Sequence, residues 1–103
     1  MASLPIIRVG DYCSGHEDWV PRPCIEGSPN VFVNGRAVHR IGDAWAIHCR
    51  EGKKRKKCHP SVAASASSNL YANGRPVCRR GDRVACGSTM VGGSVNVSNG
   101  EGE

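Results

Sequence analysis

A stretch of 14 residues, from Asn30 to Asp43, is the feature that most constrains the fold, because a second copy runs from Asn69 to Asp82. Each copy has an apolar alternation, an Asn-Gly pair, a second short alternation and then Arg-x-Gly-Asp. Asn-Gly between alternating runs predicts a β-hairpin, because both central residues of a type I′ turn need positive φ, which Asn and Gly tolerate best. We therefore expect one β-hairpin in each copy.

The pattern occurs a third time in a weaker form. Arg-x-Gly-Asp begins at Arg8, Arg40 and Arg79, and Asn-Gly follows each at Asn34, Asn73 and Asn99. The chain is thus one domain, 1–103, with repeats at about 8–35, 40–74 and 79–100. A repeated unit usually needs its copies to bury its apolar face. Because only the spacing between Asp and the next Asn varies, we interpret the hairpins as scaffold and the segments between them as inserted loops.

The composition favours an all-β fold with almost no helix. The chain has 13 Gly and 6 Pro, and it contains no long apolar stretch with 3.6-residue spacing. It has only five aromatic residues of the Phe, Trp and Tyr types, so its core must be small. A β protein with so little bulk needs a disulfide, a metal or a partner, and six Cys and four His make the first two available.

The net charge of +5 is concentrated in the run Lys53–Lys57, within a basic loop at 50–57, and the rest of the chain sums to zero. A compact charge run is usually a solvated loop tip, so a nucleic-acid partner is disfavoured. The sequence has no apolar run of membrane-spanning length and no signal peptide at its start, so we expect synthesis in the cytoplasm. In that compartment Cys and His groups favour metal binding over stable disulfides.

The segments outside the hairpins are expected to be irregular. A short apolar strand should lie within residues 1–9, and three loops should follow the Gly-Asp pairs, at 12–28, 44–68 and 83–95. Residues 98–103 form a polar tail with little to bury, for which we expect fraying.

The doubled motif resembles the PAAR-repeat proteins. The resemblance is carried by Asn30–Arg36 and Asn69–Arg75, each of which leads through a four-residue segment into x-Gly-Asp. The family's Pro-Ala-Ala-Arg is replaced by Ala37-Val38-His39-Arg40 and Pro76-Val77-Cys78-Arg79, so neither copy is literal, although the Arg and the Gly-Asp keep their places. The similarity extends over nearly the entire chain.

The resemblance implies a small cone of β-hairpins with pseudo-three-fold symmetry, stabilised by a metal near its apex. Its base would sit on a trimeric β-helical spike, either VgrG-like in a type VI secretion system or the tail spike of a contractile phage. The protein would then be a non-enzymatic tip that pierces the target envelope, touching the membrane transiently from the end of a virion tail or a secreted spike. Any effector would be a separate partner.

The family binds one zinc through three His and one Cys, and repeat equivalence selects the residues here. His16 and His48 each follow their Gly-Asp pair by five residues, and His59 and Cys86 each precede an Asn by ten. We expect these four residues to meet at the apex as a closed tetrahedral site. His39 in place of His48 is the alternate ligand, a cluster of Cys49, Cys58, Cys86 and one His is less favoured, and iron is an alternative metal.

The remaining residues are interpreted mainly as structural. Cys49 with Cys58, and Cys13 with Cys24, could form disulfides or stay as thiols. The three Asp of the Gly-Asp pairs are expected to bond loop amides and to pair with Arg8, Arg40 and Arg79. Trp19 and Trp45 are expected to cover the metal or pack between hairpins. The alternative function is a zinc-binding module that contacts nucleic acid or anionic surfaces through residues 53–57.

Overall fold

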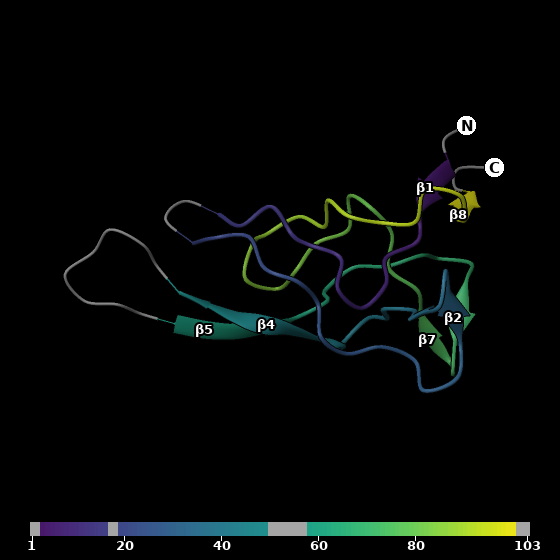
Figure 1. Cartoon of the computed structure of the whole chain (residues 1–103), viewed down its shortest axis with the longest axis horizontal. Coiled ribbons are helices and arrows are strands. Elements are labelled where there is room, and N and C mark those ends of the chain that lie inside the picture. Colours follow the sequence, from purple (N-terminus) through teal and green to yellow (C-terminus); the bar gives the residue numbers. More distant parts are fainter. Residues whose placement is uncertain (1–2, 17–18, 50–57, 101–103) are drawn as a thin grey trace.

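The computed structural model describes residues 3–16, 19–49 and 58–100, and in these residues the regular structure is β-strand and turn without any helix. The all-β prediction is confirmed. No helix suited to crossing a membrane was found among these residues. The strands are β1 (Ser3–Pro5), β2 (Phe32–Val33), β3 (Arg36–Ala37), β4 (Ala44–Cys49), β5 (Cys58–Val62), β6 (Tyr71–Ala72), β7 (Arg75–Pro76) and β8 (Ser98–Gly100). The molecule is elongated, at 47 × 29 × 21 Å, with β4 and β5 toward its narrow end (Figure 1).

Both predicted hairpins are present. Strand β2 pairs with β3 around Asn34-Gly35, and β6 pairs with β7 around Asn73-Gly74. In both turns the two central residues have positive φ, at 55° and 76° in the first and 57° and 77° in the second, as a type I′ turn requires. The paired segments are two residues long, shorter than the alternation in the sequence suggested.

The third Asn-Gly pair finds its partner at the other end of the chain. Strand β8 pairs antiparallel with β1, with Ser3 opposite Gly100 and Pro5 opposite Ser98. The expected fraying is therefore wrong for residues 98–100, because the N-terminal segment supplies the backbone partner that this short polar strand lacks nearby. Residues 101–103 lie outside the described part of the chain.

The prediction of an irregular loop at 44–68 is wrong for Ala44–Cys49 and Cys58–Val62, which form the longest strand pair of the described chain. Strands β4 and β5 pair antiparallel, with a bulge between Trp45 and His48. Both residues are buried, whereas Ile47 between them is exposed. The bulge adjusts the strand so that Trp45 enters the core and His48 faces the narrow end. The basic loop at 50–57 lies outside the described residues.

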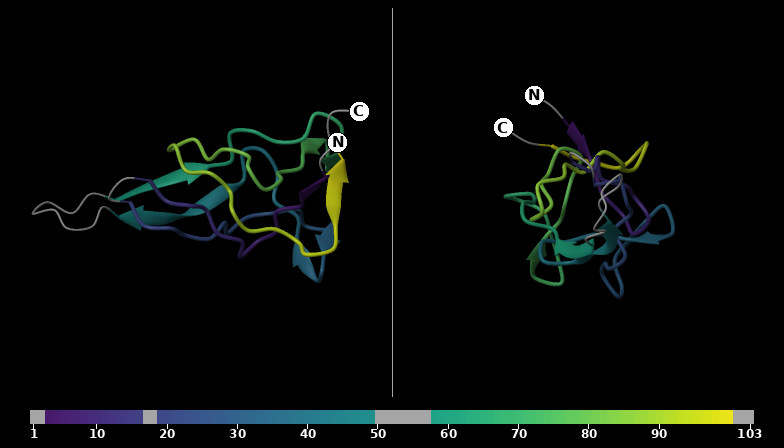
Figure 2. Two further views of the ribbon diagram at one scale, coloured as in Figure 1. Left: turned by 90° about the horizontal axis from the view of Figure 1, so that it is seen from above. Right: turned by 90° about the vertical axis from the view of Figure 1, so that its left-hand side faces the viewer.

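A closed ring of backbone hydrogen bonds joins the three repeats. It is formed by Ile7, His39 and Cys78, which occupy the equivalent position before the Arg of each repeat and are all fully buried. The Ile7 N–H donates to Cys78, Cys78 donates to His39, and His39 donates back to Ile7, each at 3.0 Å. The chain thus winds around a common axis (Figure 2). Pseudo-three-fold symmetry of the whole fold stays a prediction.

Each repeat also contains the same buried ion pair. The Asp carboxylate accepts from the side chain and the backbone N–H of the Arg three residues earlier, which closes the turn. The pairs are Arg8 with Asp11, Arg40 with Asp43 and Arg79 with Asp82. The glycine before each Asp has positive φ, between 82° and 96°. The predicted Arg–Asp pairs and glycine conformation are confirmed, whereas the backbone N–H that each carboxylate accepts from is that of the preceding Arg instead of a loop amide.

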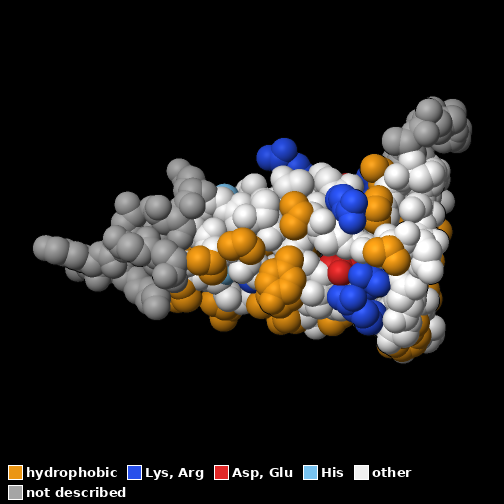
Figure 3. Space-filling model, turned by 45° about the horizontal axis from the view of Figure 1, so that its top comes forward, with side chains coloured by type: hydrophobic (Ala, Val, Ile, Leu, Met, Phe, Trp, Pro, Cys, Tyr) orange, Lys and Arg blue, Asp and Glu red, His pale blue; other side chains and the backbone are white. Residues whose placement is uncertain are grey.

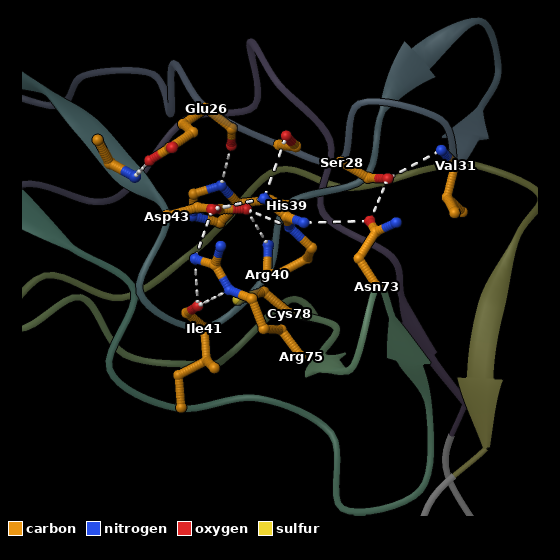
Figure 4. Close-up of polar contacts among 12 residues, drawn as sticks. Glu26, Ser28, Val31, His39, Arg40, Ile41, Asp43, Asn73, Arg75 and Cys78 are labelled. Atoms are coloured by element: carbon orange, nitrogen blue, oxygen red, sulfur yellow. Dashed lines mark hydrogen bonds and ion pairs between the residues drawn. The ribbon is translucent and has the colours of Figure 1, made fainter.

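Side chains from neighbouring repeats complete this network. Asp43, which is fully buried, accepts from Arg40 at 2.8 Å and from the more exposed Arg75 at 2.7 Å (Figure 4). The Asn73 side-chain carbonyl accepts from Arg40 at 3.1 Å and from the Ser28 hydroxyl at 2.6 Å. The Asn34 and Asn73 turns therefore dock on the guanidiniums of Arg8 and Arg40, at 2.9 and 3.1 Å, instead of standing free.

The equivalent carboxylate of the first repeat shows the electrostatic consequence. Burial acts to raise the pKa of Asp11, but hydrogen bonds from Arg8 and the charges of Arg8 and Arg36 outweigh it, so the pKa is lowered. Because the pKa of Asp11 is lower in the folded than in the unfolded protein, this carboxylate stabilises the fold above its unfolded pKa. That contribution to stability is lost as pH falls through the lower folded pKa.

We predict that Asp43→Asn lowers the free energy of unfolding by about 3 to 5 kcal/mol, because it leaves the buried Arg40 guanidinium without its counter-charge. Arg75→Met is the matched control, since Arg75 reaches the same carboxylate but its side chain is 39% exposed. This control should cost about 1 kcal/mol or less. Urea unfolding with zinc present would measure both, and equal costs would contradict the prediction.

Candidate metal centre

Four predicted ligands meet at the narrow end of the molecule. His48 on β4 lies directly opposite His59 on β5, and His16 and Cys86 come from the loops of the first and third repeats. One donor atom from each lies within 4.8 Å of every other, and His48 is buried while the other three are partly buried. The structure therefore brings together the set chosen from repeat equivalence. In Figure 3, histidine side-chain atoms, in pale blue, are visible toward the narrow end.

The backbone fixes which nitrogen of His48 faces the cluster. Its Nδ1 lies 2.8 Å from the carbonyl oxygen of Val20, which only accepts hydrogen bonds. The Arg22 guanidinium, which only donates, lies 3.1 Å from the same Nδ1, so the two contacts favour opposite tautomers. The shorter contact to Val20 favours a proton on Nδ1, which leaves the Nε2 lone pair facing the other ligands. An outer hydrogen bond of this kind, which sets the tautomer and orientation of an imidazole, is typical of metal-ligating histidines.

The donor atoms of the other two histidines fit a shared cation. His48 Nε2 and His59 Nε2 face each other at 2.5 Å, a contact that two lone pairs would oppose and a bound cation would resolve. His16 Nε2 is buried and has no hydrogen-bond partner in the described residues. In a tetrahedral zinc site the ligand atoms are separated by roughly 3.3 to 3.6 Å, so only small side-chain shifts are needed. Three imidazoles and a thiolate would fill all four positions and leave none for a substrate.

The protonation of these groups favours metal binding near neutral pH. Burial lowers the pKa of His48 and of His59, and the charges of the neighbouring Arg22 and His16 add to this in both, so both rings are neutral and able to ligate. Burial acts to raise the pKa of the Cys86 thiol, but hydrogen bonds from Ser88 and Arg22 and the charge of Arg22 outweigh it, so the pKa is lowered. The thiolate is the form that binds metal.

Arg22 is the residue of the site that sequence reasoning missed. It is 3% exposed, and its guanidinium lies 3.5 Å from the Cys86 sulfur and 3.2 Å from the Cys13 sulfur. It also lies 5.8 Å from the centre of the Trp45 ring. Arg22 has no equivalent in the other repeats, and the only local signal is its place between Pro21 and Pro23, which hold this segment extended.

Trp19 covers the cluster, as predicted. Its ring centre is 4.0 Å from that of His59, 5.2 Å from that of His48 and 5.7 Å from that of His16. Trp45 instead packs in the core, edge-on to His39. An aromatic cover excludes water from the donor atoms, which strengthens the electrostatic interactions of a bound ion.

The alternative ligands are placed elsewhere. His39 is fully buried in the ring described above, where its Nδ1 lies 2.7 Å from the Glu26 carbonyl, and it does not belong to the cluster (Figure 4). Cys49 and Cys58 form a disulfide, so the Cys-rich ligand set is not formed. Cys13 and Cys24 are free thiols, so their possible disulfide is absent from this structure.

A fold of short β-strands and loops that brings three His and one Cys together defines a small β protein with a candidate structural metal site. Over residues 14–92 the sequence matches the family described as PAAR motif, and the chain therefore belongs to this family. The family is associated with spike-tip proteins of contractile injection systems, and it is a structural family that is not known for enzymatic activity. A search of curated proteins gave no match.

We predict that His39 makes the metal-free protein less stable in mild acid. Burial lowers the pKa of His39 below its ordinary 6.5, although the Glu26 carbonyl and the Asp43 charge oppose the shift. The stability is therefore complete above pH 6.5 and is lost as pH falls below it, by at most about 1.4 kcal/mol per pH unit. His39→Ile, which copies Ile7 at the equivalent position, should flatten this dependence in urea unfolding with chelator present. Identical slopes for both proteins would refute it.

Proposed function

We propose that this protein is a non-enzymatic, zinc-stabilised tip that caps a trimeric spike in a contractile injection machine and helps it pierce the target envelope. The observation that carries the proposal is the three-His, one-Cys cluster at the narrow end of a PAAR-family chain. The machine would be a phage tail or a type VI secretion system, and any effector would be a separate partner.

The proposed metal replaces a hydrophobic core where the molecule is too narrow to contain one. The two clusters of buried apolar residues lie around Trp45 and Met90 and around Val38 and Val77, and Trp19, which covers the ligands, belongs to neither. Structural zinc binding contributes on the order of 10 kcal/mol to the folding of small domains. An ion tied to segments of all three repeats would therefore make the narrow end rigid under load. Iron remains the alternative metal.

The broad end supports the proposal that it sits on a spike. It contains an apolar pocket of about 220 Å³ between the short hairpins. Six of the residues that line the pocket occupy two equivalent positions of the three repeats: Ile6, Val38 and Val77, and Val31, Leu70 and Val97. The last three are between 37% and 39% exposed, so part of this apolar surface is open to a partner. A base built from three copies of one pattern suits a spike of three identical chains.

We predict that the purified protein contains one zinc per chain and that chelation lowers its melting temperature by more than 10 °C, because the narrow end loses its main cross-link. Alanine substitution of His16, His48 or His59, and Cys86→Ser, should each reduce the bound metal. His39→Ala should lower stability but keep the metal, since His39 lies outside the cluster. Elemental analysis would show this. Metal loss in His39→Ala but not in His48→Ala would overturn the ligand assignment.

We predict that Leu70→Asp weakens binding to the cognate spike trimer at least tenfold, because it places a charge in the apolar pocket. Ile25→Asp is the matched control: Ile25 is 58% exposed and does not line the pocket, so binding should be unchanged. Co-purification with the spike trimer, or calorimetry, would measure both variants. Equal binding by Leu70→Asp and the native protein would place the spike contact elsewhere.

A further inference from the structure

The disulfide between Cys49 and Cys58 lies directly beside two of the metal ligands. In the register of β4 and β5, Cys49 is opposite Cys58, and the neighbouring pair is His48 opposite His59. Successive residues of a strand point to opposite faces, so the two sulfurs lie on the face away from the imidazoles. The disulfide therefore acts on the ligand pair through the backbone and does not compete with it for a metal.

The same disulfide is accessible, unlike most other sulfur atoms in the described chain. Cys58 is exposed and Cys49 is partly exposed. Cys13, Cys24 and Cys78 are at most 1% exposed, and burial raises the pKa of the Cys24 thiol to about 12. Buried thiols of this kind are inert, whereas an exposed disulfide is open to thiol exchange. Apart from Cys86, which is a proposed metal ligand, redox chemistry at the described sulfur atoms is thus directed to the strand pair that carries His48 and His59.

We propose that the Cys49–Cys58 pair is a reversible redox clamp that strengthens metal binding when it is oxidised. The clamp rests on the metal site proposed above. Two thiols are oxidised to one disulfide, and a small-molecule disulfide such as oxidised glutathione accepts the two electrons and two protons and becomes two thiols. In the oxidised form the strand ends are joined, so His48 and His59 are already opposite each other. In the reduced form only the remaining pairing of β4 with β5 and the metal itself hold them opposite each other.

The disulfide and the metal affect each other: the disulfide raises the zinc affinity, and bound zinc stabilises the disulfide. Closing the loop between Cys49 and Cys58 before the metal binds is expected to raise the zinc affinity roughly ten- to a hundredfold. The conformational entropy of the loop is then lost when the disulfide forms and not when the metal binds. By thermodynamic linkage, bound metal must make the disulfide harder to reduce by the same factor. The clamp therefore gives two independent measurements of one coupling.

The test compares zinc affinity, by competition with a coloured chelator, for the native protein in oxidised form and after treatment with a phosphine reductant. The oxidised form should bind at least tenfold more tightly. The double variant Cys49→Ser/Cys58→Ser, which keeps Cys86, should bind like the reduced protein and show no response to reductant. The glutathione ratio at which half the disulfide is reduced should shift when zinc is added to the native protein.

Three results would overturn the clamp. Equal zinc affinity in both redox forms would refute it and leave the metal site standing. Tighter binding after reduction, with the stronger thiolate absorption of a cobalt(II) derivative, would show that Cys49 and Cys58 are themselves ligands. Absence of zinc binding in either form would remove both the clamp and the proposed metal site, so the two failures are distinguishable.

Discussion

The fold depends on the ring of backbone hydrogen bonds among Ile7, His39 and Cys78. Each of these residues donates to another repeat and accepts from the third, so at this position no repeat satisfies its own backbone groups. The Arg that follows each ring residue closes a turn on its Asp, and the residue before each ring position lines the broad-end pocket. One short motif thus determines an axis, a turn and a base surface, and this explains how so few apolar residues hold a defined shape.

Toward the narrow end this repeated pattern gives way to elements that occur once. The strand pair β4–β5 has only isolated bridges as counterparts in the described part of the other repeats, Tyr12 with Pro23 and Arg83 with Thr89. The cover of Trp19 and the buried guanidinium of Arg22 have no counterparts there. They enclose the four proposed ligands, His16, His48, His59 and Cys86, whose donor atoms lie close enough to share an ion. The asymmetry is physically reasonable, because a tetrahedral ion requires four ligands and three repeats cannot supply them equally.

The sequence predicted the features that are encoded locally or by repetition. Asn-Gly determined both hairpin turns, Arg-x-Gly-Asp determined the ion pairs, and equivalent spacing selected His16, His48, His59 and Cys86. It did not predict the pairing of β1 with β8, which joins opposite ends of the chain, or the strand character of 44–49 and 58–62, whose partners are separated by the basic loop. Such pairings depend on distant contacts. The role of Arg22 depends on burial, which a single Arg between prolines does not reveal.

The pairing of β1 with β8 also determines where the polypeptide enters and leaves the fold. Ser3 and Gly100 are partners, and β1 and β8 lie at the broad end, whereas β4 and β5 run toward the narrow end (Figure 1). A segment fused before β1 or after β8 would therefore emerge beside the broad end, and it would not cover the narrow end. Because Ser3 and Gly100 are paired, domains fused at both positions would compete for the same space.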